Sequence, residues 1–167
     1  MALTATLIGS IVAELTGSLD LATPSVPLDY RQRIRLTSGT GANQGDMMWS
    51  DRRTVNASSN EDLDLAGSLT GPLGTTLTFA RVKALLVTAA SANTNNVRVT
   101  RPASNGVPLF LAASDGIDVR PGGMFMWVAP DATGVAVTAG TGDLINVANS
   151  SSGTSVTYDI VIIGASA

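Results

Sequence analysis

The sequence predicts an all-β protein, an antiparallel β-sandwich that is jelly-roll-like and carries an extended N-terminal strand or arm. Apolar and polar residues alternate with a period of two through many short runs. Clusters rich in Gly, Pro, Asn, Asp and Ser separate these runs, and no run makes a convincing amphipathic helix. Short strands at this density are typical of a sandwich and less typical of a barrel.

The N-terminal segment has the longest alternating pattern. From Leu3 to Leu21 every odd position is Leu, Ile, Ala or Gly, whereas most even positions are Thr, Ser, Glu or Asp. A helix is the alternative over residues 7–15, where the Leu and Ile residues also fit helical spacing, but the glycines and threonines disfavour it. We therefore expect a strand from about Thr4 to Leu21, which is long beside the usual ~5 to 6 residues.

A returning strand follows this first one. Pro24 and Pro27 predict a turn, and the alternation resumes from Asp29 to Thr37. We expect one structural domain in which residues 1–37 form the long strand and its return and residues 38–167 form the sandwich body. So long a strand is expected to extend beyond one sheet and to pair with a neighbouring subunit or with the surface on which the protein assembles.

The body is predicted from short alternating runs separated by turn sequences such as GPLG, PASNG, RPGG and NSSSG. The expected strands are Leu63 to Leu69, Thr75 to Phe79, Arg81 to Thr88, Val97 to Thr100, Ile117 to Arg120, Met124 to Val128, Val135 to Thr138, Leu144 to Val147 and Thr154 to Ile163. Residues 38–45 are expected to be a Gly-rich surface turn. Their likeness to a phosphate-binding loop fails because no Lys-Ser or Lys-Thr pair follows.

Composition excludes several function classes. The 167 residues include no Cys and no His, which removes thiolate chemistry, imidazole bases, His-based triads and ordinary zinc sites. Ten basic against thirteen acidic residues give a net charge of -3, so we expect no nucleic-acid partner and no acidic membrane as partner. The apolar runs are shorter than a membrane span, and the N-terminus lacks the basic region of a signal peptide. We expect a soluble, non-enzymatic protein with no cofactor.

The strongest candidate surface is a row of three arginines on the returning strand. Strand geometry places alternate side chains on one face about 7 Å apart, and Arg31, Arg33 and Arg35 alternate in this way. Guanidinium groups pair well with carboxylates, so the row could contact an acidic partner. The alternative is a solvated face that pairs internally with Glu14 and Asp20. The full set of candidate interface residues comprises Arg31, Arg33, Arg35, Leu7, Ile11 and Leu15.

Two other groups of charged residues have weaker functional interpretations. Asp62 and Asp64 lie on one side of an expected strand and could begin a calcium site, but the spacing of further oxygen ligands is missing, so an exposed strand face is favoured. The sequence singles out no pair of carboxylates that could act as the acid and the base of glycoside hydrolysis. Lys83, the only lysine, could activate a Ser nucleophile; its alternation with Arg81 instead predicts an exposed charge that discourages edge pairing.

A set of scaffold segments of strands and turns, without a catalytic signature, runs from about Gly9 to the C-terminus. The segments are GSIVAELTGSLDL (Gly9 to Leu21), GTGANQGD (Gly39 to Asp46), EDLDLAGSL (Glu61 to Leu69), TFARVKALLV (Thr78 to Val87), ANTNNV (Ala92 to Val97), RPGG (Arg120 to Gly123), APDATG (Ala129 to Gly134), VTAGTGDLINVANS (Val137 to Ser150) and GTSVTYDIVIIGASA (Gly153 to Ala167). Together they resemble small structural proteins of tailed bacteriophages and prophages.

The resemblance implies a virion component, and most directly a capsid decoration (cement) protein that binds across subunits of the major capsid protein. It also implies self-association, with a homotrimer as the expected state, and assembly in the host cytoplasm onto the capsid surface. The alternative is a structural or carbohydrate-binding β-sandwich on a tail or fibre. That alternative would gain if Trp49, Trp127 or Tyr30 formed an exposed aromatic platform.

Overall fold

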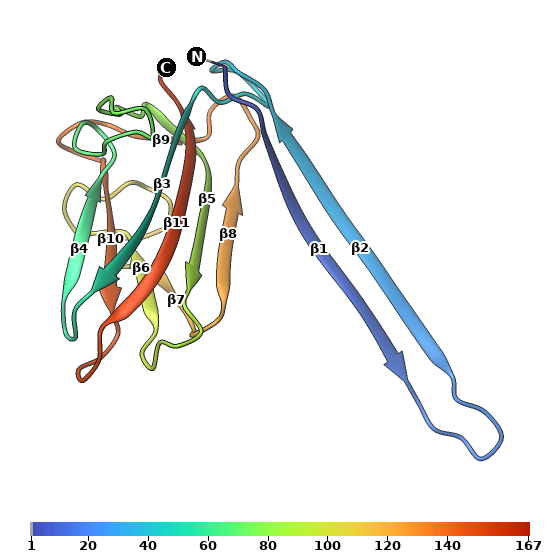
Figure 1. Cartoon of the computed structure of the whole chain (residues 1–167). Coiled ribbons are helices and arrows are strands. Elements are labelled where there is room, and N and C mark those ends of the chain that lie inside the picture. Colours follow the sequence, from blue (N-terminus) through green and yellow to red (C-terminus); the bar gives the residue numbers. More distant parts are fainter. Residues whose placement is uncertain (1) are drawn as a thin grey trace.

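The computed structural model describes residues 2–167, which form eleven β-strands and no helix (Figure 1). The predicted all-β, antiparallel sandwich is confirmed; a jelly-roll connectivity stays a prediction. The strands are β1 (Ala5–Thr16), β2 (Ser25–Leu36), β3 (Met47–Val55), β4 (Asn60–Asp64), β5 (Arg81–Ala89), β6 (Val97–Thr100), β7 (Gly116–Val119), β8 (Met124–Val128), β9 (Val135–Ala136), β10 (Leu144–Asn149) and β11 (Val156–Ala165).

Two antiparallel sheets make the body. One is five-stranded, with the order β3-β11-β5-β8 and β9 also paired to β5; the other is four-stranded, with the order β4-β10-β6-β7. The long C-terminal strand β11 lies between β3 and β5, so both of its ladders join segments that are far apart in sequence, such as Val156 with Val55 and Tyr158 with Ala89. Strands β1 and β2 form a separate two-stranded sheet that stands off the body (Figure 1).

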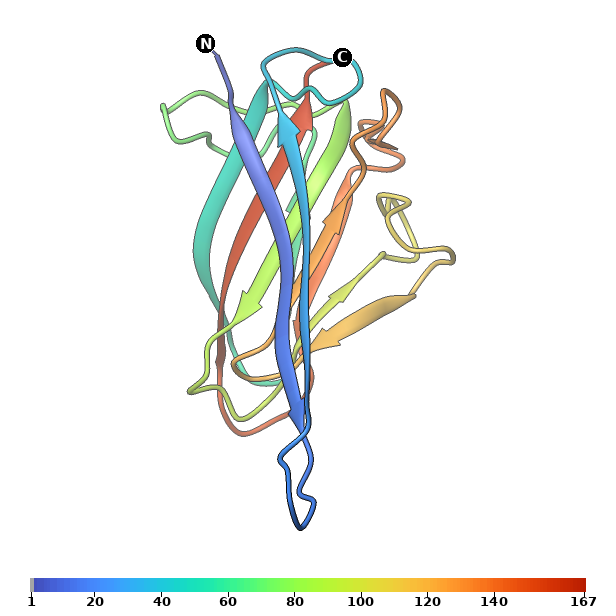
Figure 2. The ribbon, with the colours of Figure 1, turned by 90° about the vertical axis from the view of Figure 1, so that its right-hand side faces the viewer.

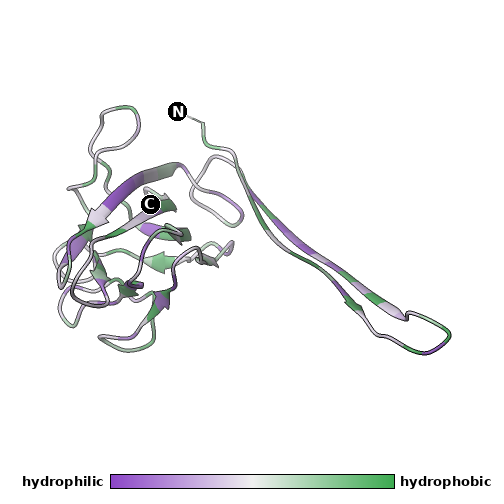
Figure 3. Ribbon diagram, turned by 60° about the horizontal axis from the view of Figure 1, so that its bottom comes forward, coloured by the Kyte–Doolittle hydropathy of each residue, from purple (hydrophilic) through white to green (hydrophobic). Residues whose placement is uncertain are grey.

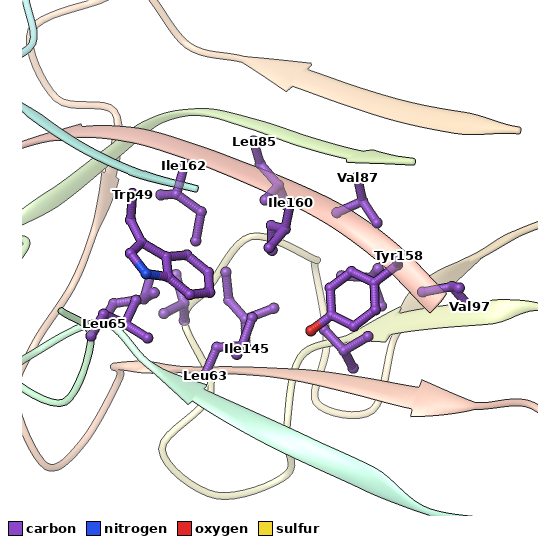
Figure 4. Packing of buried hydrophobic residues seen from close by; sticks show 14 of the residues in the cluster. Trp49, Leu63, Leu65, Leu85, Val87, Val97, Ile145, Tyr158, Ile160 and Ile162 are labelled. Carbon is purple, nitrogen blue, oxygen red and sulfur yellow. The ribbon is translucent and has the colours of Figure 1, made fainter. Parts of the chain in front are cut away.

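The core lies between the two body sheets (Figure 4). Strand β11 turns Tyr158, Ile160 and Ile162 inward, and all three are almost fully buried. Leu63 and Ile145 of the opposite sheet belong to the same buried cluster. Burying one such aliphatic side chain contributes about 1.5 to 3 kcal/mol. The body therefore has a core of its own that does not depend on β1 and β2.

The turn between β1 and β2 lies nearer the middle of the segment than the prolines predicted. Leu19 and Ala22 exchange backbone hydrogen bonds, so the turn is at residues 20–21, and Pro27 lies inside β2 opposite Glu14. Because Leu19 and Ala22 form a hydrogen-bonded pair, the register makes Glu14 and Pro27 a pair without ladder bonds. Pro27 therefore points its nitrogen to the free edge of β2 and costs no hydrogen bond.

Two body elements also differ from the prediction. Strand β3 is nine residues long, although none of the strands expected from the sequence lies between residues 47 and 55. Conversely, residues 75–79 do not form a continuous strand. The backbone amide of Leu77 donates to the Leu69 carbonyl and that of Phe79 to the Leu65 carbonyl, and the segment makes only an isolated β-bridge. Strand β4 ends at Asp64, whose carboxylate accepts from the Ala66 amide at 2.8 Å and so stabilises a turn there.

Candidate functional site

The hairpin of β1 and β2, residues 5–36, is the feature that sets this molecule apart, and we call it the arm. Each strand has 12 residues, so the arm is about 40 Å long at the usual rise per residue. Figure 1 shows it diverging from the body, and Figure 2, turned by 90°, shows it running in front of the five-stranded sheet. An isolated two-stranded hairpin is marginally stable in water, so the stability of the arm depends on what packs against it.

The register of the arm sorts its side chains onto two faces. One face, which we call the apolar face, carries the odd residues of β1 and the even residues of β2, and Ile11 lies opposite Tyr30 there. Figure 3 shows hydrophobic and hydrophilic residues alternating along both strands. Apart from Gly9 and Gln32, the members of this face are Ala5, Leu7, Ile11, Ala13, Leu15, Val26, Leu28, Tyr30, Ile34 and Leu36.

Only the base of the apolar face is covered. Leu36 is fully buried in a second cluster with Ala84 and Ile163 of the five-stranded sheet, and Leu7 and Ile34 pack partly against it. This cluster is on the outer side of that sheet, away from the main core. Packing between apolar side chains therefore fixes how the arm leaves the body.

Beyond its base the apolar face lies open to solvent. The exposed fraction is 61% for Ile11 and 74% for Leu15. Val26, Leu28 and Tyr30 on β2 are each more than half exposed as well. A soluble monomer does not ordinarily leave a contiguous apolar surface of this kind uncovered, and such patches mark interaction sites.

The body carries an apolar strip beside this open face. Met124 and Met126 on β8 are exposed, at 72% and 37%. A Cβ placed on Gly9 would lie 3.8 Å from the terminal carbon of Met126, so the apolar face of the arm looks toward β8. We call Met124 and Met126 the methionine strip. It continues the buried cluster at the arm base onto exposed surface.

The opposite face of the arm, which we call the arginine face, holds the predicted row of Arg31, Arg33 and Arg35. All three are exposed. The Nε of Arg31 donates to Oδ1 of Asp29 at 2.7 Å, on the same strand. Within residues 2–167 neither Arg33 nor Arg35 has an ion-pair partner. The predicted alternative partners are not used: Glu14 accepts a hydrogen bond from Ser25, and Asp20 lies at the tip.

The arm therefore separates the six predicted interface residues into two groups. Leu7, Ile11 and Leu15 share the apolar face, whereas the arginines lie on the other side of the same two-stranded sheet. The arginine face also carries Ile8 and Val12, which are exposed. Sequence reasoning missed Val26 and Leu28 because Pro27 suggested a turn; the alternation of Val26, Leu28 and Tyr30 was the signal available.

The prediction of an exposed Lys83 is wrong. Val82 pairs with Gly164 and Ala84 with Ile163, so Lys83 is an unpaired bulge residue, and it is fully buried. The bulge breaks the alternation on which the prediction rested. The ammonium donates to the backbone carbonyls of Gly41 and Asp131, and burial lowers the pKa of Lys83.

These bonds give the Gly-rich turn a structural role. Arg81 donates to the carbonyls of Thr40 and Ala132, at 3.3 and 3.2 Å. Together with Lys83 it ties residues 38–45 to residues 129–134. Both loops lie beside the arm base, where the Asn43 amide donates to the Pro130 carbonyl and the Thr37 amide to the Asn43 carbonyl. The turn is thus part of the support under the arm.

The acidic run on β4 is engaged in structural contacts. Glu61 accepts from Nε of Arg53 at 2.7 Å and from the Tyr158 hydroxyl at 3.0 Å. Burial, and then the adjacent Glu61 carboxylate, raise the pKa of that hydroxyl. Asp62 is exposed on the strand face and accepts from the Asn146 side chain at 2.7 Å. Across the described part of the chain, no group of three or more acidic side chains converges on a cation position.

The aromatic residues do not form a shared platform. Trp49 is buried in the core and Trp127 packs partly against it. Tyr30 is exposed on the apolar face of the arm, with Ile11 opposite and Leu28 nearby on the same strand face. Its neighbours are aliphatic, and a sugar platform needs polar groups around the ring to fix orientation.

An apolar pocket of about 410 Å³ lies beside the arm base, between residues 2–3, residues 46–48 and residues 72–77. The one ionisable group among its described lining residues is Asp46. Both oxygens of Asp46 already accept hydrogen bonds from Ser166, at 2.8 and 2.5 Å. The pocket therefore offers apolar contact and no free acid or base.

Comparisons with protein-family models, with curated proteins and with solved structures give no match to this chain. No helix in residues 2–167 is long and apolar enough to cross a membrane. The proposed function therefore rests on the arm, on its arginine row and on the resemblance of the sequence segments.

Proposed function

We propose that this chain is a non-enzymatic structural protein of a virion, most specifically a capsid decoration (cement) protein that binds across subunits of the major capsid protein. One observation carries the proposal: a hairpin with two 12-residue strands projects from a self-sufficient β-sandwich and presents three arginines in a row, two of which have no ion-pair partner within residues 2–167. A projecting element of this kind serves to reach a neighbour.

The arginine face is the proposed contact with the shell. Guanidinium groups spaced along a strand can each take a carboxylate in a bidentate geometry. Among residues 2–167, Arg33 and Arg35 have no ion-pair partner to give up, so binding a carboxylate would cost them only desolvation. The arm carries no net charge, since Glu14, Asp20 and Asp29 balance the three arginines. Glu14 and Asp29 share the arginine face but lie nearer the tip, so the positive charge is concentrated at residues 31–35, nearer the base.

Shell binding would stabilise the assembled particle by linkage. A protein that binds the assembled state and not the separate subunits shifts the equilibrium toward assembly. The sandwich body suits this task because its own core holds it rigid while the arm makes the contact. The proposed partners are the major capsid protein and further copies of this chain, on the capsid surface after assembly in the host cytoplasm.

Locating the protein in particles tests this proposal. Cryo-electron microscopy of virions that contain this chain should show it on the capsid surface, with the arm lying across a boundary between capsid subunits. Density on the tail or fibre instead would replace the decoration role with the alternative, a tail or fibre module. An exposed Tyr30 in contact with a sugar would favour the carbohydrate-binding form of that alternative.

A further inference from the structure

We infer that the apolar face of the arm, together with the methionine strip, is the surface through which copies of this chain bind one another. In the assembled state the arms pack apolar face to apolar face, and their arginine faces stay outward. The inference deepens the proposed function by giving the copy-to-copy contact, and it rests on that function for the role of the arginine face.

The open part of the apolar face, with the methionine strip, is large enough for one side of an interface. Five large side chains beyond the arm base are more than half exposed on this face: Ile11, Leu15, Val26, Leu28 and Tyr30. With the methionine strip they offer on the order of 400 Å² of apolar surface, since fully burying one such side chain contributes about 1.5 to 3 kcal/mol at about 25 cal/mol per Å². Each partner in a stable complex buries about 800 Å², of which somewhat more than half is apolar. The surface is thus close to what one partner needs.

The charge distribution of the arm also favours a second copy on the apolar face. Between Ala5 and Leu36 the apolar face contains no ionisable group except the Tyr30 phenol, so two copies can bring it together without like-charge repulsion. The arginine face behaves in the opposite way, because two arginine rows facing each other would repel. A copy of the chain therefore fits the apolar face, whereas an acidic partner fits the arginine face.

The open part of the apolar face is continuous with a contact that already exists within the chain. At the arm base the same face packs onto the outer side of the five-stranded sheet through Leu7, Ile34 and Leu36. Met126 extends that contact toward solvent, with Gly9 of the arm close to it. An incoming arm would lengthen this apolar contact instead of creating a separate one. It would also provide the packing that a two-stranded hairpin lacks alone.

Adjacent residues on the two faces provide a matched test. Ile11 and Val12 are neighbours with exposed fractions of 61% and 67%, but they point to opposite faces. Sedimentation velocity over a wide concentration range should show a self-associating wild-type protein. Ile11→Asp should weaken self-association at least about tenfold, since burying a carboxylate in an apolar contact costs more than 1.4 kcal/mol. Val12→Asp should leave it unchanged.

Introduced cysteines then test which faces meet, because the native chain has none. Under mild oxidation, Ile11→Cys should form disulfide-linked dimers and Val12→Cys should form few. A monomeric wild-type protein at every concentration would overturn the inference, as would equal effects of the two aspartate variants or equal cross-linking of the two cysteine variants. These measurements use isolated protein without shells, so their failure is distinguishable from a failure of the proposed shell binding.

Discussion

The arm and the ladder of β3 with β11 are built from similar sequence patterns and end in opposite environments. On β11 the alternating Tyr158, Ile160 and Ile162 are almost fully buried beneath a second sheet, whereas on β1 the alternating Ile11 and Leu15 face solvent. Both ladders are long and antiparallel. The difference is that one has a partner layer within the chain and the other does not. An alternating strand is stable when its apolar side is covered by other side chains. We infer that other molecules cover the apolar face of the arm.

The largest expected effect comes from removing the arm. Replacing residues 10–31 by Asn-Gly closes a short hairpin on the hydrogen-bonded pair of Gly9 and Gln32. The body should keep its fold and its thermal midpoint within a few degrees, because its core does not include the deleted residues. Self-association and shell binding should both be lost. Sedimentation and circular dichroism measure the two results.

Replacing residues 10–31 tests the role of the arm more specifically than deleting the first twenty residues would. Such a deletion would also remove Leu3, Ala5 and Leu7, which pack in the cluster at the arm base. It would therefore damage folding and assembly together. Loss of the body fold in the Asn-Gly variant would show that the arm is part of the folded unit, contrary to the comparison drawn above.

The next effect separates a covered strand from an uncovered one. Ile162→Ala should destabilise the protein by about 2 to 5 kcal/mol, because it leaves a cavity in the core. Leu15→Ala on the exposed arm should change the free energy of unfolding by less than about 0.5 kcal/mol in dilute protein. Urea denaturation gives both values. Similar losses at the two positions would mean that the arm is already packed in the single chain.

The arginine face gives a smaller, salt-dependent effect. Changing Arg31, Arg33 and Arg35 together to Gln should leave the body folded and weaken binding to shells several-fold at low salt, because exposed charge pairs contribute modestly. Wild-type binding should weaken as salt rises, and the variant should respond less. Changing Arg52 and Arg98, which pair on the body with Asp159 and Asp118, is the matched control and should not alter binding. Unchanged affinity of the triple variant at both salt concentrations would reduce the row to a solvated strand face.

The smallest effect is a pH dependence on the body. The Arg98 guanidinium donates to Asp118 at 2.7 Å and holds the pKa of that carboxyl below its ordinary value of 3.8. A carboxyl whose pKa is depressed in the folded state stabilises the fold fully above its unfolded pKa, and this stabilisation is lost as pH falls from there through the lower folded pKa. Asp118→Asn should therefore cost about 0 to 1 kcal/mol at pH 6. At pH 3 the difference from wild type should shrink, as urea denaturation can measure; a constant difference would contradict this assignment.

Much of the fold was predictable because alternation and turn chemistry are local. The strand near Met124 to Val128 and the one at Val97 to Thr100 have the predicted bounds. The alternation predicted from Asp29 to Thr37 also holds, with Arg31, Arg33 and Arg35 on one face of β2 and Tyr30 and Ile34 on the other. Lys83 could not be predicted, because a one-residue bulge is set by how β5 pairs with β11.

Other features depended on tertiary context in the same way. Strand β3 was obscured by the polar run of residues 50–54, which an edge strand tolerates because it has only one neighbouring strand. For the candidate site, the sequence predicted the arginine row and the apolar positions of β1. It did not reveal that the two sets occupy opposite faces of one projecting hairpin, because that depends on the arm finding no cover within its own chain.

Hydrogen exchange of the arm amides tests the central claim most directly, since it compares arm and body in one sample. In dilute monomer the amides of residues 8–33 should exchange much faster than those of β11, because a two-stranded hairpin is marginally stable. On self-association the arm should become protected, while β11 stays as it was. Protection of the arm that is already complete in dilute monomer, and unchanged by concentration, would contradict the claim that its cover comes from other molecules.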